Sequence, residues 1–416
     1  MKRILCAVLA FALTLCCCAC QKREPANEEC TAKDLTGDIA PRKVDEFGNL
    51  SERSAVVTDF ALRLFQNTEK EGENCLISPL SVLCALSMTA GGAKGETLAQ
   101  MEQVLGMETG ALNAWIHTYM AQLPQEEDYK LNLANSVWFR DVSHFAVEQS
   151  FLQNCADYYN AGVFKEAFDE ATRNNINRWV AENTDGEISE IVDEIPEDAV
   201  MYLVNALAFD ARWQEPYKKS QIHDGEFTTE DGEKRDVTLM YSEEGVYLED
   251  EKATGFLKYY KDQKYAFVAL LPNDGISVED YVQGLTGEKV RQMLSGAEHT
   301  TVHAAMPKFT AEYDVEMSGV LEAMGMTDAF SGSKADFSGL GNSTEGNIYI
   351  NRVLHKTYIC VDGNGTQAGA ATAVEMNKET AMPVFKVVSL DRPFVYLLID
   401  CENGIPFFIG TMMDPA

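Results

Sequence analysis

The sequence lacks the short patterns that mark most catalytic and cofactor sites. It contains no Gly-x-Ser-x-Gly elbow, no His-Glu-x-x-His pair and no phosphate-binding Gly-x-x-x-x-Gly-Lys loop, and its six histidines show no metal-ligand spacing. Gly363, Gly365 and Ala368 match a dinucleotide fingerprint in spacing only, because the residues that follow are small and suit a strand rather than a helix. We therefore expect no enzymatic activity, no metal ion and no cofactor.

Basic residues are scarce. The 416-residue chain has 34 lysines and arginines against 65 aspartates and glutamates, which gives a formal net charge of −31. This charge excludes nucleic acid and the surface of an anionic membrane as partners, because both are themselves negative. Hydrophobic residues make up 46% of the chain, which is ordinary for a globular protein.

Closely spaced cysteines are missing after residue 20. Five of the eleven cysteines lie at or before that position, and no Cys-x-x-Cys pair occurs among the other six. This spacing argues against a zinc site and makes small buried side chains the default interpretation. The six are Cys30, Cys75, Cys84, Cys155, Cys360 and Cys401.

The N-terminal apolar run, residues 4–15, is too short to cross a membrane. It follows a basic Met-Lys-Arg start, which is typical of an export signal. The run Cys-Cys-Cys-Ala-Cys at 16–20 resembles the end of a bacterial lipoprotein signal, in which the first mature residue is a lipidated cysteine. Cys20 is our first assignment for that residue and Cys18 the alternative, while a plain secretory signal remains open.

These features divide the chain into a signal peptide (1–19), a polar tether (20–45) and a folded domain (46–416). We expect the protein to be exported and to be extracellular or held at the cell surface. Its only contact with a membrane would be a lipid anchor.

Helix and strand patterns alternate along the folded part without a repeat. Helical spacing of apolar residues marks 52–68, 78–106 with a break at Gly91-Gly92, 171–186, 278–296 and 316–326. Strand patterns mark 129–140, 199–213, 265–274, a strand pair at 301–315, 348–361, and hairpins at 225–241 and 392–415. Because the strands come from both halves of the chain, the sequence predicts one interleaved α+β domain rather than two domains.

Residues 365–374, Gly-Thr-Gln-Ala-Gly-Ala-Ala-Thr-Ala-Val, are unusually small and uncharged. Side chains of a strand alternate between two faces. The face of Thr366 then carries no charge and continues through Ala368, Ala370, Thr372, Val374 and Met376. The opposite face carries the polar groups, with Gln367, Gly369, Ala371, Ala373, Glu375 and Asn377. The segment therefore suits a strand that passes between two others, although a plain small-residue linker is the simpler alternative.

From about residue 52 to its C-terminus, the chain resembles the serpins, a family of serine-protease inhibitors. The matching motifs occur in order along the whole domain. They are NCLISPLSVLCALSMTAGGAKGET (74–97), LANSVWF (133–139), LVNALAFDARWQEPY (203–217), MPKFTAEYDVEMSGVLEAMGMTDAFSGSKADFSGL (306–340), VLHKTYICVDGNGTQAGAATAV (353–374) and DRPFVYLLIDCENGIPFFIG (391–410).

The resemblance implies a serpin fold of three β-sheets and eight or nine helices, with an exposed reactive-centre loop at about 362–390. It implies a monomeric suicide-substrate inhibitor of serine endopeptidases, with cysteine endopeptidases as a second class. The target cuts the loop and forms a covalent acyl complex, and the freed part of the loop inserts into the central sheet. The implied hinge comprises Gly365, Thr366, Gln367, Ala368, Gly369, Ala370, Ala371 and Thr372.

The family's spacing places the reactive bond between Glu379 and Thr380. A shift of one residue gives a cut after Lys378, which suits a trypsin-like target, and cuts after Thr380 or Ala381 suit an elastase-like one. The chain departs from the family at Gly363-Asn364, where an acidic pair is usual, and at Gln367, where Glu is usual. Polarity is kept at these positions and the hinge has no bulky residue, so we interpret it as inhibitory; a non-inhibitory binding or surface protein is the alternative.

The resemblance also implies a polar cluster beneath the region where the sheet opens, and an aromatic residue at the point where the hinge enters. The cluster comprises Ser78, Ser81, Asn205 and His355, and the aromatic residue is Trp213. Simpler interpretations remain for three of them: Ser78 as a helix cap, His355 as a satisfied buried histidine and Trp213 as ordinary core.

Overall fold

The computed structural model describes residues 29–126, 129–142, 145–343, 346–366 and 385–415. These residues form nine α-helices, three large β-sheets and a two-stranded ribbon, which confirms the predicted α+β class. The helices are α1 (Ser51–Thr68), α2 (Pro79–Ala90), α3 (Gly95–Leu105), α4 (Thr109–Met120), α5 (Gln149–Tyr158), α6 (Glu170–Asn183), α7 (Val278–Gln283), α8 (Gly287–Ser295) and α9 (Ser318–Ala323).

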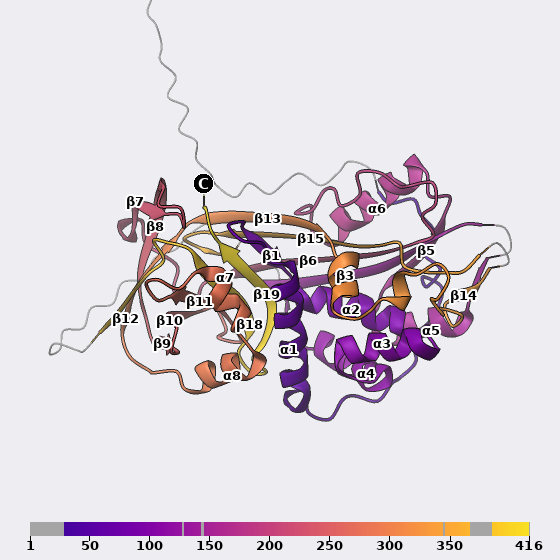
Figure 1. Ribbon diagram of the computed structural model, residues 1–416, viewed down its shortest axis with the longest axis horizontal. Coiled ribbons are helices and arrows are strands. Elements are labelled where there is room, and N and C mark those ends of the chain that lie inside the picture. The colour runs from indigo at the N-terminus through magenta and orange to yellow at the C-terminus, as the bar shows by residue number, and fades with distance from the viewer. Residues whose placement is uncertain (1–28, 127–128, 143–144, 344–345, 367–384, 416) are drawn as a thin grey trace, which may run out of the picture.

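Seven strands form the largest sheet, which we call the central sheet. Its order is β13 (Phe309–Glu316), β15 (Arg352–Val361), β16 (Gly365–Thr366), β6 (Met201–Arg212), β3 (Tyr129–Arg140) and β2 (Gln125–Glu126), and β5 (Gly162–Glu166) also pairs with β3. Figure 1 shows β13, β15 and β6 side by side along the molecule, with α2–α5 below the sheet and α6 above it.

The two other large sheets lie toward the end of the molecule remote from α6 (Figure 1). The six-stranded sheet has the order β1 (Cys75–Ile77), β19 (Ile405–Met412), β18 (Phe394–Asp400), β11 (Tyr265–Pro272), β10 (Ala253–Tyr259) and β9 (Val246–Glu249). The four-stranded sheet has the order β17 (Lys386–Ser389), β12 (Val302–Pro307), β8 (Lys234–Glu244) and β7 (Ile222–Thr228). The ribbon joins β14 (Gly341–Asn342) to β4 (Ala146–Val147).

β6 is the buried central strand that its apolar run predicts. Its side chains alternate between two hydrophobic cores, as the two-residue period of a strand requires. Leu203 and Leu207 join the main core, which includes α2, whereas Tyr202 and Val204 join a second core that includes α6. The central sheet is therefore covered on both faces at this strand.

Most predicted elements match, and two differ in an informative way. Residues 301–315 do form two strands, but β12 belongs to the four-stranded sheet and β13 to the central sheet. Residues 278–296 form two helices, α7 and α8, because α7 ends at Gly284. The sequence analysis did not identify α4, α5, β1, β2, β4, β5, β9, β10, β14 or β17.

Residues 29–45, predicted as part of a polar tether, run along α5 and β5. The amide and guanidinium of Arg42 both donate to the buried carboxylate of Asp157 in α5, and the Nη2–Oδ2 distance is 2.6 Å. Asp34 forms a β-bridge with Phe164, and the amide of Leu35 donates to the carbonyl of Val163 at 2.8 Å. Among the helices of the described ranges, none is long and apolar enough to span a membrane.

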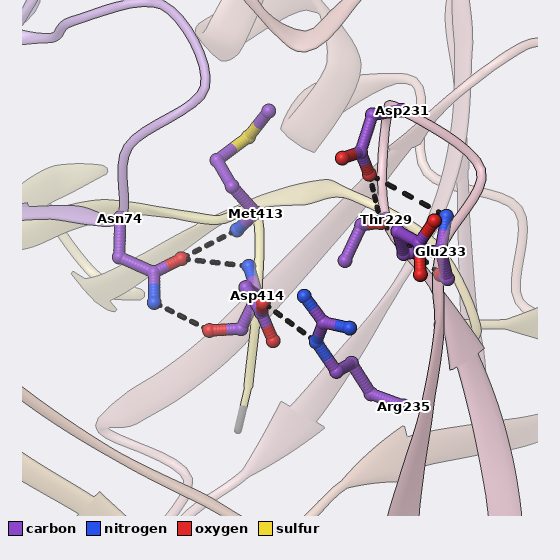
Figure 2. A network of polar contacts seen from close by, with 7 residues as sticks. All are labelled: Asn74, Thr229, Asp231, Glu233, Arg235, Met413 and Asp414. Carbon is purple, nitrogen blue, oxygen red and sulfur yellow. Dashed lines mark hydrogen bonds and ion pairs between the residues drawn. The ribbon is translucent and has the colours of Figure 1, made fainter.

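The last described residues are tied to two sheets by polar contacts (Figure 2). The side chain of Asn74, just before β1, accepts from the amides of Met413 and Asp414 at 2.6 and 3.0 Å and donates to the Asp414 carbonyl at 2.5 Å. The Asp414 carboxylate pairs with Arg235 of β8 at 2.9 Å. These contacts join the six-stranded sheet to the four-stranded sheet.

The predicted break at Gly91-Gly92 separates α2 from α3 and lets two backbone segments meet. The carbonyl of Gly92 accepts from the amide of Gly339 at 3.0 Å, and a Cβ built on Gly92 would lie 2.1 Å from Leu340 Cδ2 and 2.9 Å from the Leu340 nitrogen. A side chain at this position therefore has no room.

We expect Gly92→Ala to lower the free energy of unfolding by about 1–3 kcal/mol, because the added methyl forces a packed backbone apart. Gly110→Ala is the matched control: its Cβ would meet nothing within 4 Å and it lies in α4, so it should be neutral or stabilise by up to ~1 kcal/mol. Thermal unfolding of both variants checks this. Equal melting temperatures would contradict the close contact.

Candidate functional site

The site lies where two neighbouring strands of the central sheet part. β6 and β15 run parallel and pair directly from Tyr202 with Arg352 to Leu207 with Thr357. Beyond that point β16 lies between them and is antiparallel to both, with Thr366 opposite Ala211 on one side and Val361 on the other. β16 therefore separates β6 from β15 over two residues. The two strands pair directly with each other from Leu207 and Thr357 to Tyr202 and Arg352.

The first two residues of the predicted hinge form β16. A Cβ on Gly365 would lie 2.1 Å from the Ala211 carbonyl oxygen, so only glycine fits this close approach to β6. Thr366 is fully buried, and its Oγ1 lies 2.6 Å from the hydroxyl of Tyr260. The rest of the hinge (367–372) and the reactive-bond candidates Lys378, Glu379, Thr380 and Ala381 lie outside the described residues.

Trp213 holds the turn that leads into β16. Its indole Nε1 donates to the carbonyl of Asp362 at 2.9 Å, and its backbone N–H donates to the carbonyl of Asn364 at 2.9 Å. Its ring stacks on Tyr260 with the centroids 4.6 Å apart. Because Tyr260 also contacts Thr366, the aromatic residue predicted at the hinge is linked to both sides of the turn.

A buried cation lies beside Trp213, and the sequence analysis did not identify it. Lys258 Nζ lies 2.8 Å from Glu244 Oε1, 5.3 Å from the centroid of the Trp213 ring and 4.4 Å from that of Tyr217. The amide of Tyr217 in turn donates to the carbonyl of Gly363 at 2.7 Å. The ion pair therefore supports the aromatic side chains that border the hinge. No local pattern around Lys258 marks it, because Glu244 comes from β8, and Trp213 and Tyr217 come from the segment that follows β6.

The four predicted polar residues meet between α2 and the directly paired part of β6 and β15. Asn205 Oδ1 lies 3.2 Å from Ser81 Oγ and 2.6 Å from His355 Nδ1. The amide of Ser78 donates to His355 Nε2 at 2.9 Å, while the Ser78 side chain accepts from the Ser81 amide and caps α2. All four side chains are fully buried.

These contacts fix the tautomer of His355. Because Nε2 accepts from the Ser78 amide, the ring proton is on Nδ1 and is donated to Asn205. Burial lowers the pKa of His355 to about 3. The imidazole is therefore neutral at physiological pH, and a second proton would place an N–H donor against the Ser78 amide. Within the described ranges, no group of three His, Cys, Asp or Glu side chains is placed to hold a metal ion.

The stability of the protein should fall as the pH drops below about 6.5. The folded pKa of His355 is about 3, below its unfolded value near 6.5, so the unfolded chain takes up a proton first. The loss is at most about 1.4 kcal/mol per pH unit between those values and is absent above pH ~7. His355→Asn removes this group, so the melting temperatures of variant and wild type should converge from pH 7 to pH 4.5. A gap that stays constant over this range would refute the assignment.

Comparisons with known proteins agree with this geometry. A family model described as "Serpin (serine protease inhibitor)" matches residues 55–415. Human Serpin B8 is 31% identical over 370 residues, which cover 86% of this chain and 97% of that protein.

Solved structures of one thermophilic serpin, Tengpin, are 46% identical to the chain. Its native-state structure covers 92% of this chain and 99% of its own, with a TM-score of 0.89. Its latent-state structure covers 90% and 100%, with a TM-score of 0.78. The present fold is thus more similar to the native state of that relative than to the latent state. By its family model, its relatives and its fold, the chain belongs to the serpins, the serine protease inhibitor family.

Proposed function

We propose that the protein is a suicide-substrate inhibitor of serine endopeptidases, which traps the acyl-enzyme by inserting the cleaved reactive loop into the central sheet. One observation carries the proposal: β16 lies between β6 and β15 at one end, while the two strands pair directly at the other. A strand that continues from β16 would have to separate them.

The register of β16 predicts where each inserted residue would lie. Gly365 pairs with Arg212 and Thr366 with Ala211, so each further hinge residue moves one residue back along β6. Thr372 would then lie opposite Asn205, and Met376 opposite Met201. Continuing the pairing of Thr366 with Val361 along β15 places Thr372 opposite His355. Insertion would therefore separate Asn205 from His355 and bring a hydroxyl between them.

The same register supports the face assigned to the uncharged residues. Ala368, Ala370 and Val374 would lie opposite Phe209, Leu207 and Leu203 of β6, all of which belong to the main core. Direct cross-strand neighbours project on the same face of a sheet. On the opposite face Ala373 would meet Val204, in the core below α6, whereas Gln367 would meet the half-exposed Asp210 at the end of β6.

The covalent step is the protease's own. Its serine oxygen attacks the carbonyl carbon of the residue before the cut, Glu379 in our first assignment, and the bond to Thr380 breaks. The new amine of Thr380 takes the proton that the serine has given up, and Glu379 stays attached to the protease as an ester. This chain supplies the peptide bond that is cut, and its central sheet supplies the insertion step that follows.

Insertion would carry the protease away from the hinge. Residues 365–379 extended as a strand span roughly 50 Å at ~3.3 Å per residue. The attached protease is pulled against its own fold, and a displaced oxyanion hole loses roughly 10²–10³ in rate for each hydrogen-bond donor lost. Hydrolysis of the ester then stalls. Export and lipid anchoring at Cys20 or Cys18, as predicted from the signal, would place this trap outside the cell.

The alternative, a non-inhibitory binding or surface protein, is not favoured by the described part of the hinge. A bulky or charged residue at its start would prevent β16 from forming, and the chain has Gly365 and Thr366 there. The better agreement with the native-state relative also supports a fold whose sheet has yet to accept the loop.

We expect a covalent adduct when residues 29–416 are incubated with glutamyl-specific, trypsin-like and elastase-like serine proteases. Denaturing gels and mass spectrometry would show an adduct and a released peptide that begins at Thr380, or at Glu379, Ala381 or Met382 for the alternative cuts. Insertion should also raise the melting temperature on the order of 20 °C, because a new central strand adds many backbone hydrogen bonds. Clean cleavage with active protease recovered and an unchanged melting temperature would refute the mechanism.

Charge at position 372 should convert the inhibitor into a substrate. Thr372→Lys would bury an unpaired cation beside the neutral His355, which slows insertion, so the stoichiometry of inhibition should rise about tenfold or more. Gln367→Lys is the matched control, because it puts the same charge opposite Asp210 at the half-exposed end of β6. Titration of protease activity measures both variants. Similar stoichiometries for the two would contradict the register.

A further inference from the structure

Arg352 begins β15 on the face of the central sheet that α6 covers. It pairs across the sheet with Tyr202 of β6, which belongs to the core below α6, and its guanidinium carbon lies 5.8 Å from the centroid of the Tyr202 ring. The side chain is half-buried, and within the ranges that the structure describes it forms no ion pair. Asp314 of β13 lies in the field of Arg352, but its carboxylate pairs with Lys356, at 3.7 Å.

The strand pairings around this residue share one register. β6 and β15 pair directly with an offset of 150 residues, from Tyr202 to Arg352. β16 pairs Thr366 with Ala211 of β6 and with Val361 of β15, and these two partners are also 150 residues apart. A strand that continues β16 would therefore find each present pair of β6 and β15 in step on its two sides. Neither strand would have to slide along the other.

Counting along these pairs brings Glu375 of the reactive loop to Tyr202 on one side and to Arg352 on the other. Glu375 follows Thr366 by nine residues, and the same count runs nine residues back along both strands. Because nine is odd, the side chain of Glu375 would project to the face opposite that of Thr366, which is the face of α6. Glu375 itself lies outside the described residues, and it is the only charged residue from 365 to 377.

Desolvation makes a cation necessary at this place. The core below α6 is apolar around Tyr202, where the ring of Phe168 packs with the centroids 5.3 Å apart. A carboxylate that entered it without a partner would lose its hydration and gain nothing. Neighbouring cations are already engaged, because Arg140 donates to two backbone carbonyls and Lys356 pairs with two acids of β13. Arg352 is left to meet the incoming carboxylate.

We propose that Arg352 is a positioning residue for inhibition, which binds the carboxylate of Glu375 when the cleaved loop inserts and so secures the far end of the new strand. The proposal rests on the proposed inhibitory function. Only four residues separate Glu375 from Glu379, to which the protease is attached in our first assignment. Insertion competes with hydrolysis of the ester, so a contact made at the last positions of the strand decides between trapping and release.

The test measures the stoichiometry of inhibition with the full mature chain. The probe is whichever of the glutamyl-specific, trypsin-like or elastase-like proteases reacts fastest. Arg352→Glu and Glu375→Arg should each raise the stoichiometry about fivefold, because two like charges then meet in the core below α6. The double variant exchanges the two ends of the ion pair, so its stoichiometry should return to within about twofold of wild type.

Two control variants separate the ion pair from general effects of charge. Arg352→Gln removes the cation without adding a repulsion, so it should raise the stoichiometry only about twofold. Arg53→Glu makes the same change in net charge as Arg352→Glu, but on the exposed first turn of α1, and should behave as wild type. The uncleaved variants should melt within about 3 °C of wild type, because the described part of the uncleaved protein gives Arg352 no acidic partner.

A second measurement examines the pair in the absence of a trapped protease. A metalloprotease attacks the peptide bond with a metal-activated water and forms no ester, so it yields the cleaved chain without an adduct. Mass spectrometry would confirm a cut between 377 and 384. Insertion should make this form more resistant to guanidinium chloride. Arg352→Glu should then lower the unfolding midpoint of the cleaved form by about 0.3 M more than that of the uncleaved form.

The outcomes separate the role of Arg352 from the inhibitory function. Unchanged stoichiometry and unchanged midpoints in the single variants, with normal adducts, would overturn the ion pair and leave the inhibitor intact. Impaired single variants that the double variant does not restore would make Arg352 merely structural, which also overturns the proposal. If wild type forms no adduct, the inhibitor falls, and the midpoints of the metalloprotease-cleaved form still decide the ion pair. A cleaved wild type that is no more resistant than the uncleaved chain would overturn both.

Discussion

The central sheet depends on the pairing of β6 with β15, which, in the mechanism that we propose, must give way to an inserted strand. Their direct pairing extends from Tyr202–Arg352 to Leu207–Thr357, and β16 occupies the first positions beyond it. Strands held only by backbone hydrogen bonds can separate if every bond is re-formed with the newcomer. In that mechanism the hinge needs residues that are small and uncharged enough to pass between the strands, in the register that β16 sets.

The polar cluster joins β6 to β15 in the part of the central sheet where the two strands pair directly. It does so through side-chain hydrogen bonds, which could be re-formed with a strand inserted between them. Asn205 and His355 share a hydrogen bond of 2.6 Å across β6 and β15, and both are fully buried. Apolar side chains at these two positions could also pack between the strands. They would, however, form no hydrogen bond with the side chain of an inserted strand. Buried polar groups must be satisfied in both states. In the insertion that we propose, continuing the register of β16 would bring the hydroxyl of Thr372 to this position.

Features governed by local pattern were predictable from the sequence. The strand at 129–140 and the central strand at 199–213 follow from alternation and continuous apolar residues, and the burial of Thr366 agrees with the uncharged face to which alternation assigns it. Long-range pairing was not predictable. β12 and β13 are separated only by Lys308, yet they join different sheets because their partners lie elsewhere in the chain. The Lys258–Glu244 pair was not predictable for the same reason. A buried lysine is acceptable there because the rings of Trp213 and Tyr217 cover it, and both rings come from another part of the chain.

In the proposed mechanism, cleavage would divide the reactive loop into two parts with different roles. The part before the cut ends in the residue that selects the protease, Glu379 in our first assignment, and would then have to leave its place and become a strand. The part after the cut remains hydrogen-bonded through β17 to β12, and it includes the exposed Phe385 and Val387. Any contact made there favours encounter but opposes the later departure of the protease.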